Sequence, residues 1–223
     1  FKYFSYYQNL FPTKNSLVIA IKSNSEIDRV LIEEIEKISK KLSDLPEVYS
    51  VFTINKAPIL LLNKTSLIDL ANNNYETILN SNLPFEDILN EYAKSPIYSD
   101  QIINEIKNIT SIVIFLNENS KAIDLKNNKN LYLTQGKYYK IKTEIDNERN
   151  KLIKKIRNII INSNQYFTYY LGGVEMISSD VISYVKNDIF TFSLIVLIVI
   201  VLILFLIFRR VKWVFAILFT SIS

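Results

Sequence analysis

The side chains in this sequence whose grouping could support chemistry are carboxylates. They gather at two places, with Glu33, Glu34 and Glu36 in the first and Glu144, Asp146 and Glu148 in the second. Carboxylate oxygens are the ligands that hard divalent cations prefer. Lys residues are interleaved with both groups or follow them closely, which is the pattern of a charged, solvent-facing helix surface. We therefore expect no metal site at either place.

Several kinds of catalytic residue are missing from the sequence. It contains no His and no Cys, which excludes histidine acid–base catalysis, Ser-His-Asp triads, thiol nucleophiles and His/Cys zinc sites within these residues. Its three glycines, Gly136, Gly172 and Gly173, cannot form a P-loop or a dinucleotide-binding fingerprint. We therefore predict a protein that is not an enzyme, with no catalytic residue, no metal and no cofactor, and we assign no substrate-binding residue.

The net charge of +4 does not indicate a nucleic-acid partner. The Lys residues are spread among Asn and Glu rather than gathered in a basic patch with aromatic residues between them. Solvated helix faces account for this charge. The 14 Tyr residues leave two interpretations open, because they could line a cleft for a hydrophobic substrate or form the core and its rim.

One stretch, residues 189–208, is apolar and contains no charge, Gly or Pro. At about 1.5 Å rise per residue, a helix of about 20 residues measures about 30 Å, the thickness of the hydrocarbon core of a bilayer. Its polar exceptions, Thr191 and Ser193, can bond to carbonyls of their own helix. A buried helix of a soluble protein would normally keep a polar stripe or be much shorter, so the stretch predicts a transmembrane helix.

The residues after this stretch predict its direction. Three basic residues follow it closely: Arg209, Arg210 and Lys212. Because short basic connections between spans face the cytoplasm, we expect residues 209–213 to be a cytoplasmic turn and residues 214–223 to start a further transmembrane helix. Residues 1–188 would then be extracytoplasmic (periplasmic). We interpret the chain as a piece of a multi-pass protein of the cell (inner) membrane, in which residues 1–15 connect to a preceding membrane helix.

The first part of the extracytoplasmic region has the pattern strand, helix, strand. Residues 16–23 form a compact β-branched run that predicts a strand. Ser25 and Asp28 then resemble a capping box, in which Ser25 caps a helix that continues to about Leu42. Residues 48–54 return as a second strand. The face of the helix predicted to pack on the sheet carries Ile27, Val30, Leu31, Ile35, Ile38 and Leu42.

A second pattern of this kind follows after an insert. Residues 58–96 break the rhythm, so we interpret them as an inserted helical excursion. In the last strand, Phe167, Tyr169 and Leu171 alternate toward the inside. The elements expected from the insert onward are short helices near 66–71 and 85–94, strands at 101–105 and 109–116, a loop at 117–129, a helix at 137–162 and a strand at 166–171.

Two β-α-β units in this order predict a ferredoxin-like α+β sandwich over residues 16–173, followed by transmembrane α-helices. A polar lead-in helix at residues 174–188 would join the outer domain to the span at 189–208. Gly172 and Gly173 stand at the junction and leave two interpretations open: a tight turn out of the last strand, or a hinge between the outer domain and the membrane.

Three stretches add a family resemblance to this order of elements: YLGGVEMI at residues 170–177, NSLVIAI at 15–21 and LPEVYSV at 45–51. The first, followed by the apolar span and the basic turn, is similar to the junction between the outer loop and the second membrane helix of the resistance-nodulation-division (RND) superfamily. The other two resemble the first porter strand and the entry into the second. The branch that the sequence resembles most is that of the MMPL-like hydrophobe exporters.

The resemblance implies a fragment with the first extracytoplasmic porter domain, the second transmembrane helix and the start of the third. It also implies an exporter that uses the proton-motive force to move hydrophobic or amphiphilic, lipid-like substrates, with this part as the outer substrate-handling domain. Charged residues of middle helices carry the protons in such proteins, and residues 189–208 have none. The implied partners are the lipid bilayer, the substrate, and a homo-oligomer or periplasmic accessory proteins.

Two alternative functions stay open. One is an extracytoplasmic ligand-sensing domain of a membrane receptor. Such a receptor would continue into a polar signalling helix after Arg210, whereas this sequence returns to apolar residues at 214–219. The other alternative is a protein-translocation accessory of the same superfamily.

Overall fold

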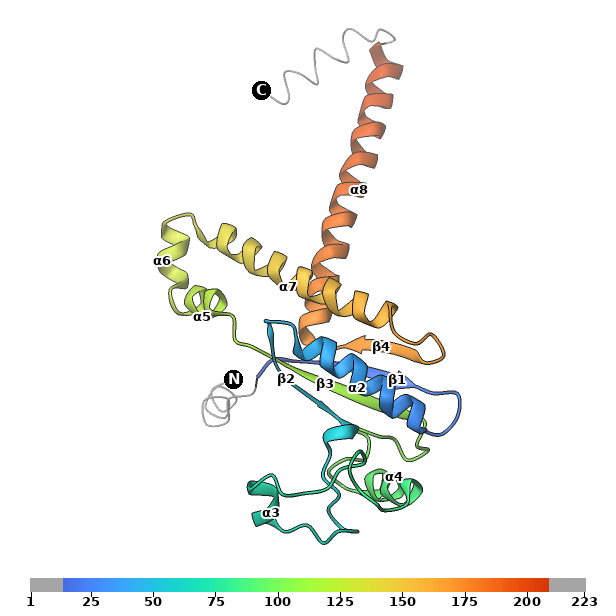
Figure 1. Cartoon of the computed structure of the whole chain (residues 1–223). Coiled ribbons are helices and arrows are strands. Elements are labelled where there is room, and N and C mark those ends of the chain that lie inside the picture. The colour runs from blue at the N-terminus through green and yellow to red at the C-terminus, as the bar shows by residue number, and fades with distance from the viewer. Residues whose placement is uncertain (1–13, 209–223) are drawn as a thin grey trace. The chain divides into compact units, whose positions relative to one another are not determined.

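The computed structural model of the chain describes residues 14–208 (Figure 1). The expected basic turn, the final apolar run and nearly all of the N-terminal connection therefore lie outside the described residues. The chain divides into two compact units that meet between Ser179 and Asp180. The first unit is a mixed α/β domain, and the second continues the long helix α8, Val174–Phe208.

The first unit is built on a four-stranded sheet with the order β2-β3-β1-β4, in which every neighbouring pair is antiparallel. Leu17 pairs with Ile114 across β1 and β3, and Ile19 pairs with Leu171 across β1 and β4, so apolar residues of adjacent strands share one face. The strands are β1 (Ser16–Lys22), β2 (Val48–Thr53), β3 (Ile109–Leu116) and β4 (Thr168–Gly172).

Two helical crossovers connect these strands, and each skips one strand. Helix α2 (Arg29–Ser43) joins β1 to β2, with β3 lying between them; helix α7 (Tyr138–Ile161) lies on the connection from β3 to β4, with β1 between them. Because β1 and β2 are both antiparallel to β3, they run parallel to each other. The two helices contact each other, and both lie over the sheet in Figure 1. The crossovers are therefore interleaved.

The core lies between this sheet and the two helices. Leu17, Ile19 and Ile21 of β1 are fully buried at every second position, as a half-covered strand requires. In the last strand, the predicted inward alternation is confirmed, because Phe167 is buried and Tyr169 and Leu171 pack against the core. From α7, the core receives Leu152, Ile153 and Ile156.

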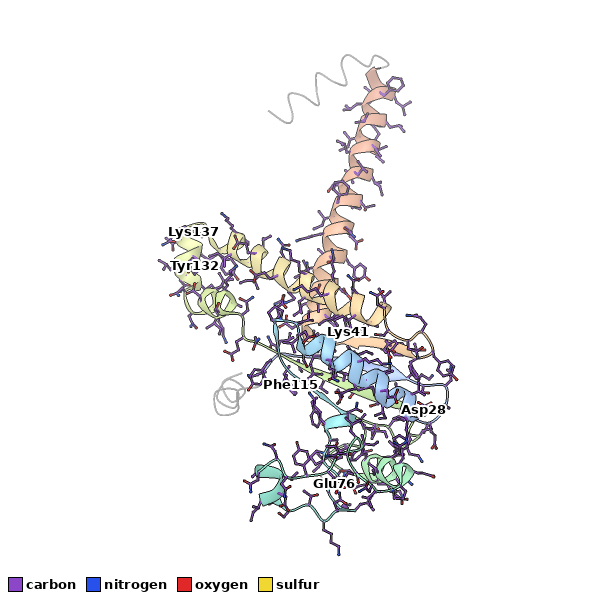
Figure 2. The ribbon with its side chains drawn as sticks, in the orientation of Figure 1. Asp28, Lys41, Glu76, Phe115, Tyr132 and Lys137 are labelled. Atoms are coloured by element: carbon purple, nitrogen blue, oxygen red, sulfur yellow. The ribbon has the colours of Figure 1, made fainter. Side chains whose placement is uncertain are left out.

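Helix α2 begins later than the sequence suggested. Asp28, labelled in Figure 2, is its N-cap instead of Ser25. One carboxylate oxygen of Asp28 accepts a hydrogen bond from the Leu31 amide at 2.8 Å. The backbone before it is engaged elsewhere, since the Ile27 amide donates to the Lys107 carbonyl at 2.7 Å. Val30 is 56% exposed, so its placement on the packing face was wrong. Successive residues of a helix lie about 100° apart around its axis, and the face that packs on the sheet passes through Leu31 and Ile35 instead.

The insert after β2 is helical, as predicted, with α3 at Leu67–Ala71 and α4 at Phe85–Lys94. Glu91 of α4 holds its loop in place. Glu91 is only 8% exposed, and its carboxylate accepts hydrogen bonds from three successive backbone amides, of Leu60, Leu61 and Leu62, at 2.6, 2.9 and 2.8 Å. The next residue, Tyr92, donates its hydroxyl to the Ala57 carbonyl at 2.6 Å, and burial raises the pKa of that hydroxyl. Hydrogen bonds of Glu91 and Tyr92 therefore hold the loop of the insert against α4, next to buried apolar side chains.

The strand expected at residues 101–105 is absent, and a turn takes its place. Asp100 has a φ of 59°, and its amide donates to the Ile103 carbonyl at 2.9 Å, which closes a tight reversal. Ile103 forms only isolated bridges. Ile102 and Ile103 are both buried, whereas an extended strand would point them to opposite faces. The predicted polar turn near Lys107, which has a φ of 57°, is present before β3.

The loop expected at residues 117–129 is also wrong. Helix α5 (Ser120–Asn127) begins after Asn119, whose side-chain oxygen accepts a hydrogen bond from the Ala122 amide at 3.2 Å. Helix α6 (Lys129–Thr134) follows it. Only Leu125 of α5 is buried, so the segment lacks the apolar period by which a helix is recognised. Its cap residue was the available signal.

Candidate functional site

The end of the sheet where β1 begins and β4 ends gathers ionised side chains from distant parts of the first unit. Arg149 of α7 forms ion pairs with Glu175, in the first turn of α8, and with Asp146 at 3.2 Å. The Asn15 amide donates to the other oxygen of Glu175 at 2.8 Å. Arg149 and Glu175 side chains are 25% and 16% exposed, so solvent screens this pair only partly. We call these four residues the junction cluster.

Gly173 lets the chain turn from β4 into α8 beside this cluster. Its φ is +128°, a conformation that L side chains rarely adopt, and a Cβ atom there would lie 2.9 Å from the Ser16 carbonyl oxygen. Gly172 is still paired with Val18 in the sheet. A tight turn with close backbone approach therefore accounts for Gly173 without a hinge.

The first turns of α8 are anchored in the first unit. Met176 packs against the apolar core, and the buried Ser179 hydroxyl donates to the Asn150 side-chain oxygen of α7. Together with Arg149–Glu175, these contacts join two helices through residues 25 to 30 positions apart. The helix that continues toward the apolar span is thus fixed at its beginning to α7.

A cavity of about 530 Å³ opens at the same end of the sheet. Its apolar lining comes from β3, α5 and α7, and its rim carries charged side chains, including the Arg149–Glu175 pair of the junction cluster. The apolar lining residues are Leu116, Ala122, Ile123, Ile145 and Leu152, and the charged ones are Lys14, Glu47, Glu118, Lys126, Glu148, Arg149 and Glu175.

One carboxylate of α7 binds the beginning of α5. Glu148 accepts hydrogen bonds from the Lys121 ammonium at 2.6 Å and from the Asn119 amide at 3.1 Å. The Lys121 bond holds the pKa of Glu148 below its ordinary value. The Lys121 and Glu148 side chains are 49% and 46% exposed, so water weakens this attraction. The hydrogen bonds that join α5, one wall of the cavity, to Glu148 of α7 are therefore exposed to solvent.

A second ion pair closes another part of the rim. The Lys155 ammonium lies 2.8 Å from a carboxylate oxygen of Glu47, and this bond lowers the pKa of Glu47. Glu47 immediately precedes β2, so the pair ties α7 to the strand at the edge of the sheet.

Four of the six carboxylates weighed in the sequence bind protein partners. Glu34 accepts a hydrogen bond from the Asn164 amide at 2.9 Å and lies near Lys37, and Glu36 lies near Lys40. Asp146 and Glu148 belong to the contacts described above. Among residues 14–208 we find no group of three or more acidic side chains placed to hold a metal ion.

Helix α8 is long and apolar enough to cross a membrane from Val174 to Ile207, and none of its most apolar part is buried against protein. The sequence expected a separate lead-in at residues 174–188 and a span at 189–208; the structure has one continuous helix over both. The lead-in supplies Glu175 and Ser179 to the contacts with α7. What sequence reasoning missed is the cavity and the junction cluster, because residues 15, 149 and 175 meet only in the folded chain.

Comparison with known proteins is consistent with this arrangement. A comparison with curated proteins gave no match. The family model of the MMPL family matches residues 135–222, which include α7, β4 and α8. The match therefore covers both helices of the junction cluster and the apolar span. The match supports the recognition drawn from the sequence: residues 135–222 are similar to the MMPL family, which is consistent with a fragment of an RND/MMPL superfamily protein.

Proposed function

We propose that this chain is part of a membrane exporter driven by the proton-motive force, which moves hydrophobic or amphiphilic, lipid-like substrates. Residues 16–173 would be its extracytoplasmic porter domain, which handles the substrate, and α8 its second transmembrane helix. The proposal includes a multi-pass protein in the cell membrane that is not an enzyme. Similarity of residues 135–222 to the MMPL family supports it, together with an apolar helix and a preceding domain whose open cavity has an apolar lining.

The strand order supports a ferredoxin-like porter domain. In that fold, two β-α-β units interleave so that the strands of each unit flank a strand of the other. The order β2-β3-β1-β4, with helical crossovers that skip one strand, has this arrangement. The insert with α3 and α4 would be an addition to this fold between its second and third strands.

The observation that carries the proposal is the anchoring of α8 to α7 at the junction cluster. Because α8 is one continuous helix, an axial displacement of its apolar part would act on Glu175 and, through the ion pair, on Arg149. Arg149 and Glu175 both line the cavity. We propose that this contact couples motion of the membrane helix to the outer domain. Residues 189–208 carry no ionisable side chain, so protons would move through other helices.

An export assay with paired charge variants tests the coupling. We expect Arg149→Glu and Glu175→Arg each to abolish export of a lipophilic dye from energised cells, and the double variant to restore part of it, because the attraction is re-formed. An uncoupler should stop the wild-type export. Equal export by all variants, or export that ignores the uncoupler, would contradict the proposal.

The absence of Cys makes sidedness directly testable. Leu67→Cys, at a position 84% exposed, should react in intact cells with a maleimide that cannot cross membranes. Lys212→Cys should react only after permeabilisation, because we expect the basic turn to be cytoplasmic. Reaction of both in intact cells would disprove the proposed orientation. A receptor instead of an exporter would be indicated by no uncoupler-sensitive export from the wild type, together with a transcriptional response to ligand that the Arg149 and Glu175 variants abolish.

A further inference from the structure

We propose that the cavity between α5, α7 and the end of β3 binds the alkyl chain of a single-chain amphiphile whose head group has no net charge. The site deepens the proposed function and rests on it for the idea that the cargo is amphiphilic. Three features of the cavity support the binding itself: its apolar lining, the charges around it and the solvent-exposed contacts that hold one of its walls.

The lining is suited to an alkyl chain. Leu152 and Ile145 come from α7, Leu116 from the end of β3, and Ala122 and Ile123 from α5. Three separate elements thus supply an apolar surface, and part of this surface stays exposed to solvent. Ile123 remains 43% exposed. The volume of about 530 Å³ falls within the range of about 300–1,000 Å³ found for small-molecule sites.

The charges on the rim balance one another. Three of its four carboxylates have cationic partners, as described above for Glu47, Glu148 and Glu175. In the described part of the chain, Glu118 has no ion-pair partner, and the rim residues Lys14 and Lys126 face no carboxylate within ion-pair distance. If the paired residues Lys121, Lys155 and Asp146 are included, five cationic and five anionic side chains surround the cavity, so their charges sum to zero. A charged head group would gain little here, whereas a zwitterionic or uncharged polar one can bond to both signs.

Helix α5 is the wall that can admit the chain. Within α5, only Leu125 is buried, while Glu148 holds the helix through two exposed contacts. By contrast, α7 buries four side chains, Ile145, Leu152, Ile153 and Ile156. Displacement of α5 therefore uncovers only one buried side chain of that helix and breaks two solvent-exposed polar contacts, and Ile153 and Ile156 of α7 stay in the core of the sheet. An entering alkyl chain would in turn cover Ile123.

Contact quenching in the full chain tests the site. With Trp213→Phe, the only native Trp is removed. Ile123→Trp then reports from the cavity wall, and Leu67→Trp, on α3, serves as the matched control. In amphipol, without detergent, we expect ω-bromododecylphosphocholine to quench the cavity indole saturably, and the control only weakly and without saturation.

Three further results decide the proposal. Ala122→Phe, which fills the cavity, should weaken binding about tenfold, with an unchanged far-ultraviolet circular dichroism spectrum as the folding control. The anionic ω-bromododecanoate and the cationic ω-bromododecyltrimethylammonium should bind more weakly than the phosphocholine. Equal quenching of both indoles by every probe would overturn the site, and preference for an ionic probe would overturn the head-group assignment.

The binding and export results are separable. Saturable quenching together with export that Ala122→Phe leaves unchanged would support the cavity as an amphiphile site and contradict its place on the export route. Loss of saturable quenching with intact uncoupler-sensitive export would overturn this inference and leave the proposed function standing.

Discussion

The first unit and the apolar part of α8 use the same aliphatic side chains in opposite ways. Ile19 of β1 is fully buried, whereas Ile198 of α8 is 56% exposed. In β1, buried positions alternate with partly exposed ones, so one face packs on the helices. In the most apolar part of α8, up to Ile207, apolar residues occupy all sides, and none of them is buried by the described part of the chain. The difference shows that pattern, rather than hydrophobicity alone, separates a buried protein core from an apolar surface that the protein leaves uncovered.

A neighbouring pair in α2 offers the largest test of this contrast. Leu31 is fully buried and Val30 is 56% exposed. We expect Leu31→Ala to lower the free energy of unfolding by about 2–5 kcal/mol, because it leaves a cavity in a packed core. Val30→Ala should change it by about 0.5 kcal/mol or less. Urea unfolding of the membrane-reconstituted chain measures both, and similar losses would show that α2 packs differently.

A charge in α8 tests the other side of the comparison. We expect Ile198→Arg to cost about 3 kcal/mol of membrane insertion, because an arginine at the centre of a span must be solvated in hydrocarbon. Ile198→Ala is the control and should insert normally. A glycosylation-based insertion assay with both variants measures the effect. Normal insertion of the arginine variant would argue that this part of α8 faces water or protein.

The connection between the two regions can be tested at a glycine. Gly173→Ala should destabilise the first unit by about 1–3 kcal/mol, since the new Cβ meets the Ser16 carbonyl and the backbone conformation is strained. Gly136, with a φ of +66°, is the control for conformation alone, because nothing lies within 4 Å of its added Cβ. Unfolding of both variants separates the clash from the strain. Equal losses of unfolding free energy in the two variants would show that the contact with the Ser16 carbonyl contributes nothing.

The smallest effect is expected at the α5 wall and depends on pH. The folded-state pKa of Glu148 lies below its ordinary value of 4.5 because of the bond from Lys121. The stabilisation is therefore fully present above that value and is lost as the pH falls through the lower, folded-state pKa. Hydrogen exchange, corrected for intrinsic rates, should show a few-fold faster opening of α5 under acid conditions. Glu148→Gln should open faster already at neutral pH, whereas Glu144→Gln should match the wild type; a pH-independent α5 would refute this role.

Much of the fold could be predicted where a period is strong. The pattern of β1, the helix α7 and the apolar span were read from the sequence because alternation, a 3.6-residue period and uninterrupted apolarity are local signals. Residues 101–105 and α5 were misread. In the first case a left-handed Asp100 closes a turn that no local apolar pattern announces, and in the second a single buried residue, Leu125, gives no period.

The sequence by itself determined that this chain carries a helix long and apolar enough to span a membrane, an α/β domain before it and the resemblance to MMPL proteins, because these properties depend on composition and on neighbours along the chain. The tertiary structure alone decided which strands lie side by side and that Asn15, Arg149 and Glu175 form one cluster. The cavity beside that cluster was likewise decided only by the tertiary structure. Hydrogen bonds, ion pairs and cavities bring together residues more than a hundred positions apart in the sequence, and a local pattern of residues cannot predict such contacts.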